Sequence, residues 1–235
     1  MRNIGMPAGT LWQPLRYLKI VSPSFPDLKL SRRLFMKSPA HFVALLVGMF
    51  LLSTLAASAV NTVVIDAGHG GHDRGGGPGQ YIPEKPYTLD VALRLRARLR
   101  EAGFRTVMTR DGDYFVGLRE RCQIANSQGD AVFVSIHFNS APREGASGIE
   151  TYYYSGRSGS LAAALHSAVL RATGAEDRHV RVRGYYVLRH TEIPAALVEG
   201  GFLTNYSEGG RISGSAAYRQ RIADAIASVL ISRYR

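Results

Sequence analysis

Four side chains in this sequence are of the types that bind a metal ion or activate water. His69 follows a short apolar run, His137 ends another, Glu84 precedes a helical pattern, and Glu199 is an acid inside a third apolar run. A catalytic zinc ion usually has three protein ligands from histidine, acidic or cysteine side chains and keeps one position for water. A buried carboxylate is costly without a partner, and for Glu199 a water held by a metal would serve. These residues therefore form a candidate metal site.

Each of these signals also has a simpler explanation. A single histidine at the end of a strand is more often a hydrogen-bonded structural residue than a ligand. A glutamate before a helix also interacts favourably with the helix dipole. The glycine-rich segment 68–77 could bind a phosphate, but it has neither Gly-x-Gly-x-x-Gly entering a helix nor the Lys-Ser/Thr of a P-loop. Taken one at a time, the residues leave these alternatives open.

The elements that must position these residues alternate along the chain. Short apolar runs predict strands at 62–67, 104–110, 131–138, 148–154, 185–189 and 195–202. Helical spacing predicts helices at 89–102, 118–128, about 160–172 and 216–234. This order predicts an α/β fold: a single domain with a mainly parallel central sheet of about six strands and helices on both faces.

In sheets of this kind, ligands bind beyond the carboxyl ends of the strands. Asp66 with His69, His137 with Asn139, and Glu199 all lie at such strand ends. The strand pattern therefore predicts that residues far apart in the sequence meet at one edge of the sheet.

The charge of the chain is unevenly distributed. The net charge is +11 over 235 residues, but the first 59 residues hold seven Lys and Arg against one Asp, which leaves 22 basic and 17 acidic residues in the remainder. The arginines of that remainder are scattered, without the basic and aromatic stripe of a nucleic-acid binder. The single cysteine, Cys122, cannot form an internal disulfide and falls in a helical pattern, which favours a buried apolar role over a nucleophilic one.

The first 59 residues have the features of an export signal. An apolar run at 42–57 follows basic residues and ends in Ala-Ser-Ala, so we expect cleavage near 59/60 and a catalytic domain at 60–235. The segment "SRRLFMK" at 31–37 resembles the twin-arginine export motif, with Met36 in place of leucine. Translation from Met36 would instead give an ordinary secretory leader, and an uncleaved anchor is a third reading. Both export routes place the protein in the periplasm or cell envelope, with no membrane span in the mature chain.

Six segments, taken in order, resemble the motifs of one family. They are "VVIDAGHGG", "EK" at Glu84, "TRDGDYFVGLRERCQIAN", "SIHFNS", "GIETYYY" and "LVEGGFLTN". They are similar to the zinc-dependent N-acetylmuramoyl-L-alanine amidases of the peptidoglycan amidase type 3 family, over residues 60–234. The resemblance implies hydrolysis of the amide between N-acetylmuramic acid and L-alanine in peptidoglycan. It also implies one Zn²⁺ bound by His69, Glu84 and His137, with Glu199 as the catalytic carboxylate.

The resemblance suggests roles for further residues. Glu199 would take a proton from water and pass it to the leaving amine. Asp66 or Asn139 would orient a ligand imidazole, as ligating histidines usually require. His72 is expected at the rim and is the alternative ligand if Glu84 does not bind.

The sequence leaves several alternatives open for the partners of the chain. Four arginines could bind the carboxylates of the stem peptide or face solvent: Arg178, Arg181, Arg183 and Arg189. Peptidoglycan is the expected substrate, and an activator protein is a further partner that the sequence leaves open. The competing hypotheses are a zinc peptidase acting on wall or free peptides and a catalytically silent wall-binding module.

Overall fold

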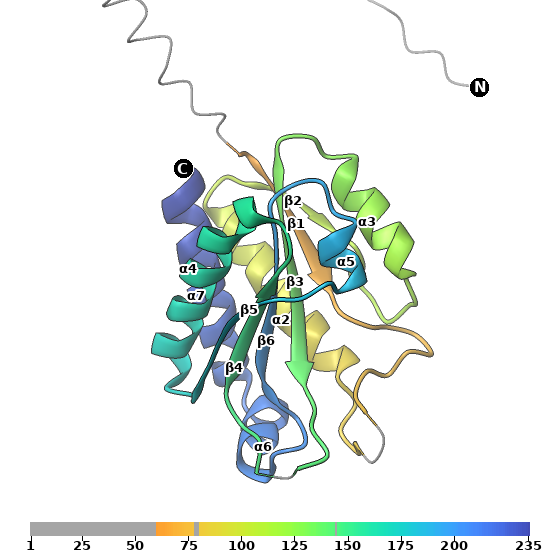
Figure 1. Cartoon of the computed structure of the whole chain (residues 1–235), viewed down its shortest axis with the longest axis vertical. Coiled ribbons are helices and arrows are strands. Elements are labelled where there is room, and N and C mark those ends of the chain that lie inside the picture. Colours follow the sequence, from red (N-terminus) through yellow and green to blue (C-terminus); the bar gives the residue numbers. More distant parts are fainter. Residues whose placement is uncertain (1–59, 78–79, 144) are drawn as a thin grey trace, which may run out of the picture. The chain divides into compact units, whose positions relative to one another are not determined.

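A six-stranded sheet forms the centre of the part of the chain that the computed structural model describes, residues 60–77, 80–143 and 145–235 (Figure 1). The strand order is β2-β1-β3-β6-β4-β5. The bounds are β1 Thr62–Ala67, β2 Arg105–Met108, β3 Ala131–Asn139, β4 Ile149–Tyr153, β5 Asp177–Val182 and β6 Ala195–Phe202. Strands β2, β1, β3 and β6 are parallel, whereas β4 pairs antiparallel with β6 and parallel with β5. The predicted α/β class and mainly parallel sheet are confirmed.

Helices cover both faces of this sheet (Figure 1). Helices α2 (Lys85–Glu101), α4 (Gly159–Thr173) and α7 (Ala216–Tyr234) pack together on one face. Helices α3 (Leu118–Asn126) and α5 (Tyr186–Arg189) pack together on the other. The 3₁₀ turn η1 (Gly156–Ser158) precedes α4, and α6 (Tyr206–Gly214) follows β6.

Alternation along the strands divides the core between the two faces. In β1, Val63 and Ile65 belong to the core under α2, α4 and α7, while Val64 belongs to the core under α3 and α5. Phe133 of β3 and Leu197 of β6 lie in the second core as well. Continuing by two residues at a time, the α3 and α5 face receives Asp66 from β1, His137 from β3 and Glu199 from β6.

The two faces are not covered equally. The helices on the larger core have 17, 15 and 19 residues, whereas α3 has nine and α5 has four. On the side of the short helices, residues at the carboxyl ends of β1, β3 and β6 line a cavity. The sheet therefore presents its strand-end polar residues to an open space on this face, as the strand-end rule for α/β sheets predicts.

One predicted strand is a helix in the structure, and one strand and one helix were not predicted. Within the predicted strand 185–189, residues Tyr186–Arg189 form helix α5: Val187 and Leu188 are buried next to each other, which a short apolar run permits in either conformation. The sixth strand is instead β5, which the sequence pattern does not predict because charged residues interrupt it, as is common at a sheet edge. Helix α6 was also missed, since it contains three glycines and depends on capping by the Asn205 side chain.

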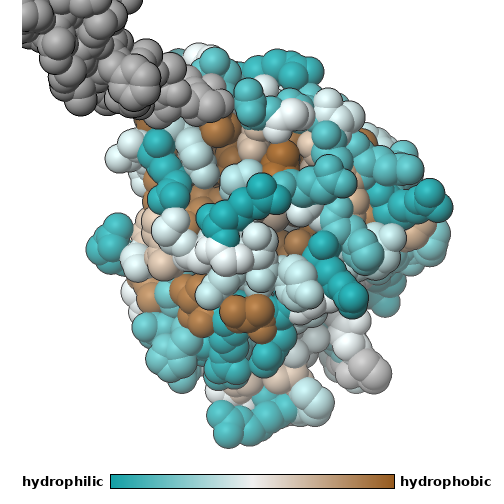
Figure 2. All heavy atoms as spheres, turned by 45° about the horizontal axis from the view of Figure 1, so that its top comes forward, coloured by the Kyte–Doolittle hydropathy of each residue, from teal (hydrophilic) through white to brown (hydrophobic). Residues whose placement is uncertain are grey.

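The N-terminal predictions lie outside the described residues. These are the export signal at 1–59, the twin-arginine motif at 31–37, the hydrophobic region at 42–57 and cleavage near 59/60, which stay predictions. Within the described ranges, no helix has the length and apolar character needed to span a bilayer. On the face that Figure 2 shows, hydrophobic residues form small brown patches separated by hydrophilic ones.

Candidate active site

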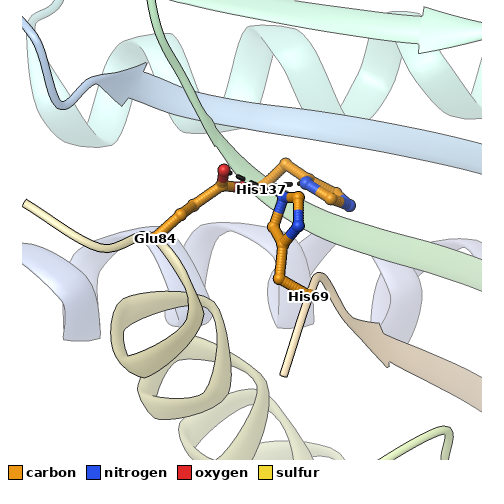
Figure 3. A group of neighbouring side chains, drawn as sticks. All are labelled: His69, Glu84 and His137. Carbon is orange, nitrogen blue, oxygen red and sulfur yellow. Dashed lines mark hydrogen bonds and ion pairs between the residues drawn. The ribbon is translucent and has the colours of Figure 1, made fainter. Parts of the chain in front are cut away.

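Three of the predicted site residues converge at the carboxyl end of the parallel strands (Figure 3). His69 follows β1, Glu84 stands at the N-terminus of α2, and His137 lies near the end of β3. One potential ligand atom from each lies within 4.8 Å of the others. Glu84 bridges the two rings, with Oε2 3.0 Å from Nε2 of His69 and Oε1 2.8 Å from Nδ1 of His137. The imidazoles are nearly perpendicular, with centroids 4.8 Å apart.

Glu84 is a buried carboxylate that the fold keeps ionised. Its Oε1 accepts a hydrogen bond of 2.9 Å from the backbone N–H of Phe138. Burial acts to raise its pKa, but the charges and hydrogen bonds of His137 and His69 outweigh burial and lower the pKa to about 2. A deprotonated carboxylate between two imidazoles is a donor set that suits Zn²⁺.

His69 is oriented by Asp73, four residues further along the chain. The Nδ1 of His69 lies 2.8 Å from Oδ2 of Asp73, which leaves Nε2 toward Glu84. Oδ1 of Asp73 accepts a hydrogen bond of 3.0 Å from the N–H of Gly75, which holds the carboxylate in place. His69 itself has a φ of 62°, a strained value for a residue other than glycine. The loop therefore stores local strain to present this ring.

The predicted orienting residues have other partners, so that expectation was wrong. Asp66 is buried and accepts hydrogen bonds from Thr109, Ser135 and Arg121 at 2.6–2.7 Å. Asn139 donates to Glu150, which also pairs with Arg178. Asp73 could have been found from its spacing, because an acid four residues after a histidine in a tight glycine-rich loop can fold back onto the ring.

Two glycines allow the loop after β1 to approach the ligands. A Cβ on Gly68 would lie 2.3 Å from Cε1 of His137. A Cβ on Gly75 would lie 2.5 Å from Cβ of Glu84 and 2.7 Å from Cδ2 of His69, and Gly75 also has a φ of 70°. These glycines are required by close contact and backbone conformation, which flexibility alone would not explain.

Two buried arginines tie the site's loops together. Arg110 donates to the carbonyls of Ala67, Gly68, Gly112 and Lys85 and to the hydroxyl of Thr88, which joins the end of β1 to the start of α2. Arg121 donates to the carbonyls of Val116, Ala67 and His69 and to Asp66. Both arginines lie in the motif "TRDGDYFVGLRERCQIAN", but the sequence predicts no role for them, because their near-complete burial is visible only in the fold.

Glu199 is buried on β6, opposite His137 in the register of neighbouring strands. Among the described residues, its Oε2 is buried and has no hydrogen-bond partner. Burial raises the pKa of Glu199 to about 8, against a lowering effect of His137. A buried carboxyl with an unsatisfied oxygen and a raised pKa is suited to exchange protons near neutral pH.

His69, Glu84, His137 and Glu199 line one cavity of about 660 Å³. Its other walls come from the glycine-rich loop, the segment that leads into α3, and the residues at α5. The apolar contributors are Phe115, Val116, Leu118, Phe138, Tyr185, Tyr186, Val187 and Leu197. The cavity has the size of a small-ligand site, with polar groups collected at one end and apolar side chains beside them.

The remaining candidate residues lie away from the three candidate metal ligands. His72 is exposed and stacks on Phe115 with centroids 4.2 Å apart, so it is a rim residue as expected. The four arginines considered for peptide binding do not line the cavity described above: Arg178 pairs with Glu150, Arg181 lies near the same carboxylate, and Arg183 and Arg189 are exposed. Cys122 is buried in the smaller core, as expected.

Known proteins share this sequence and fold. The family model Amidase_3, described as N-acetylmuramoyl-L-alanine amidase, matches residues 63–232. An uncharacterised protein of Bacillus subtilis, YqiI, is 38% identical over 177 residues, which cover 74% of this chain and 84% of that protein. The N-acetylmuramoyl-L-alanine amidase LytC of B. subtilis is 34% identical over 178 residues, covering 74% of this chain but only 36% of LytC.

A solved structure agrees with these sequence matches. The catalytic domain of CwlV, an N-acetylmuramoyl-L-alanine amidase from Bacillus (Paenibacillus) polymyxa var. colistinus, superposes with a TM-score of 0.70 at 36% identity, covering 73% of this chain and 97% of that domain. The chain is therefore an enzyme of the Amidase_3 family of N-acetylmuramoyl-L-alanine amidases.

Proposed function

We propose that this chain hydrolyses the amide bond between N-acetylmuramic acid and L-alanine in peptidoglycan, using one Zn²⁺ held by His69, Glu84 and His137. The observation that carries the proposal is the convergence of their three ligand atoms within 4.8 Å, in a cavity that is also lined by Glu199, whose buried Oε2 has no hydrogen-bond partner among the described residues. Two imidazoles and one carboxylate are a common ligand set of zinc hydrolases. Family membership supports both the substrate and the metal.

The side chains divide the work of the reaction. A bound zinc ion lowers the pKa of water and polarises a carbonyl oxygen. Glu199 accepts the proton of the attacking water at its carboxylate and delivers it to the nitrogen of the leaving L-alanine. Asp73 fixes the ring of His69, and the backbone N–H of Phe138 fixes Glu84, so the ligands are held before substrate binds.

The products of digested sacculi test this function. Mass spectrometry is expected to find intact stem peptides that begin with L-alanine. Trimmed stems that stay attached to the glycan would indicate a zinc peptidase instead. Binding to sacculi without any cleavage, unchanged in Glu199→Ala, would indicate a silent wall-binding module.

We also infer that residues 1–59 direct export and that residues 60–235 act in the periplasm or cell envelope. Residues 42–59 carry the apolar run and the Ala-Ser-Ala site that support this proposal. N-terminal sequencing of the exported protein is expected to begin near Val60. Arg32→Lys with Arg33→Lys should block export if the twin-arginine route operates and leave it unchanged if a leader begins at Met36.

A further inference from the structure

One side of the cavity is formed by exposed uncharged side chains that the proposed reaction does not use. Phe115 lies in the segment that leads into α3 and Leu118 begins that helix, while Tyr185 directly precedes α5 and Tyr186 begins it. They are 48%, 55%, 42% and 40% exposed, respectively. We refer to these four as the apolar wall. Large apolar side chains gathered in the open around a cavity are typical of a binding surface.

The rings of the apolar wall are held in place by other rings. Phe115 stacks on His72 with centroids 4.2 Å apart, and Tyr186 stacks on His190 at the same distance. Tyr185 meets the edge of Tyr152 at 5.1 Å. Helices α3 and α5 also pack against each other. The wall is therefore organised before any ligand binds, which reduces the entropy lost on binding.

The charges around the cavity argue against an anionic occupant of the wall. The lining carries four carboxyl groups: Asp66, Asp73, Glu84 and Glu199. Arg121 is the lining residue with a full positive charge, and its Nε, Nη1 and Nη2 all donate to protein oxygens. The described wall offers no free cation to a peptide carboxylate. An uncharged sugar ring has C–H faces that pack on aromatic rings and hydroxyls that can bond to the two tyrosine O–H groups.

We propose that the apolar wall is a saccharide subsite that binds the N-acetylated sugar on the glycan side of the scissile amide. The proposal rests on the proposed function, because it assigns one end of that substrate to one side of the cavity. With the sugar ring on Phe115 and Tyr186, the lactyl amide extends toward the polar end of the cavity, where Glu199 lies. The peptide then leaves from the side away from α3 and α5.

Kinetics on two soluble substrates with the same lactyl-L-alanine amide test the subsite. One carries the N-acetylmuramic sugar and the other lacks it. In the full chain, Phe115→Ala and Tyr186→Ala are each expected to lower kcat/KM for the glycopeptide about tenfold, mainly by raising KM. The ratio of kcat/KM for the glycopeptide to kcat/KM for the sugar-free substrate should therefore fall. Tyr186→Phe keeps the ring but lacks the hydroxyl, so its ratio should lie between those of Tyr186→Ala and the wild type. Tyr206→Ala is the matched control, because Tyr206 is 98% exposed on α6 and does not line the cavity.

A binding measurement separates failure of the subsite from failure of the proposed reaction. The probe is an uncharged oligomer of N-acetylglucosamine, which presents the same N-acetylated sugar ring without the lactyl carboxylate, titrated by calorimetry or NMR into the full chain and into Glu199→Gln. Both are expected to bind, and Phe115→Ala is expected to weaken binding about tenfold. No binding at millimolar glycan, or an equal loss of kcat/KM on both substrates, would overturn the saccharide subsite. If the wild-type chain binds the glycan but does not hydrolyse the glycopeptide substrate, the subsite stands and the proposed reaction is overturned.

Discussion

Glu199 combines burial with an oxygen that no described group satisfies, an arrangement that costs stability unless it serves chemistry. Replacement by glutamine keeps the size of the side chain but removes the proton acceptor. We expect Glu199→Gln to reduce release of stem peptides by a factor on the order of 10²–10⁴. Zinc content, measured by elemental analysis, should be unchanged. The exposed Glu192→Gln should retain full activity, and equal activity in both variants would exclude Glu199 as the catalytic carboxylate.

Asp73 illustrates how a neighbouring residue tunes a ligand. Asp73→Asn keeps a hydrogen-bonding side chain beside Nδ1 of His69 but removes the negative charge. Loss of such a partner typically lowers metal affinity by about 10-fold to 100-fold. Competition with a chromophoric chelator is expected to show this decrease, whereas Asp224→Asn on α7 should bind zinc like the wild type. If Asp73→Asn bound zinc normally, orientation of His69 would have to come from its backbone alone.

At the scale of elements, the loop between β1 and α2 must bring two ligands from different segments into contact. Gly75→Ala would place a methyl group against both His69 and Glu84 at a backbone φ of 70°. We expect this variant to lose zinc affinity and activity together. Gly210→Ala in α6 is the matched control, because its added Cβ meets nothing within 4 Å and raises helix propensity, stabilising by up to about 1 kcal/mol. Thermal unfolding and zinc titration of both variants measure the contrast.

The ion pair of Asp66 and Arg121 joins β1 to α3 in the interior. Burial acts to raise the pKa of Asp66, but Arg121 and the hydroxyls of Ser135 and Thr109 lower it below its ordinary value. A carboxyl whose pKa is lower in the folded state stabilises the fold above its unfolded pKa, near 4, and loses this contribution as pH falls further. Denaturant unfolding measured from pH 7 to 3 should show that the free energy of unfolding of the wild type falls as the pH drops below about 4.

The same pair makes a mutational prediction. Asp66→Asn is expected to be less stable than the wild type at pH 7 by about 3 to 5 kcal/mol, because Arg121 is left buried without its counter-charge. Its free energy of unfolding should also fall less steeply at acid pH, because the carboxyl that titrates is gone. The exposed Asp130→Asn should follow the wild-type curve. An acid dependence of Asp66→Asn identical to that of the wild type would show that other carboxyls control acid unfolding.

At the scale of the whole molecule, a bound metal joins β1, α2 and β3 at one point. A ligand present at 100 times its dissociation constant adds about 2.7 kcal/mol to folding stability. For a chain of this size, chelation of zinc is expected to lower the unfolding temperature by roughly 5 to 10 °C. His137→Ala should show no change on chelation. Calorimetric scans with and without chelator measure the difference, and an equal fall in both proteins would mean that the metal binds elsewhere.

Local patterns in the sequence determined the order of most elements and the edge of the sheet that carries the chemistry. Short apolar runs predict β1, β3 and β6, and the rule that ligands bind at strand carboxyl ends brings Asp66, His137 and Glu199 to one edge of the sheet. The order of the motifs also pointed to the family that the comparisons show.

Only the tertiary structure decided the partners of these residues and the shape around them. Asp73, not Asp66, orients His69, and residues Tyr186–Arg189 fold as α5 because Val187 and Leu188 are buried together against the smaller core. Arg121 supports His69 across 52 residues of sequence. A local pattern specifies which side of an element is apolar, but hydrogen-bond partners and the open end of the sheet depend on how distant elements pack. The convergence of the candidate site's residues could therefore be predicted from the sequence, whereas their supports and the apolar wall required the fold.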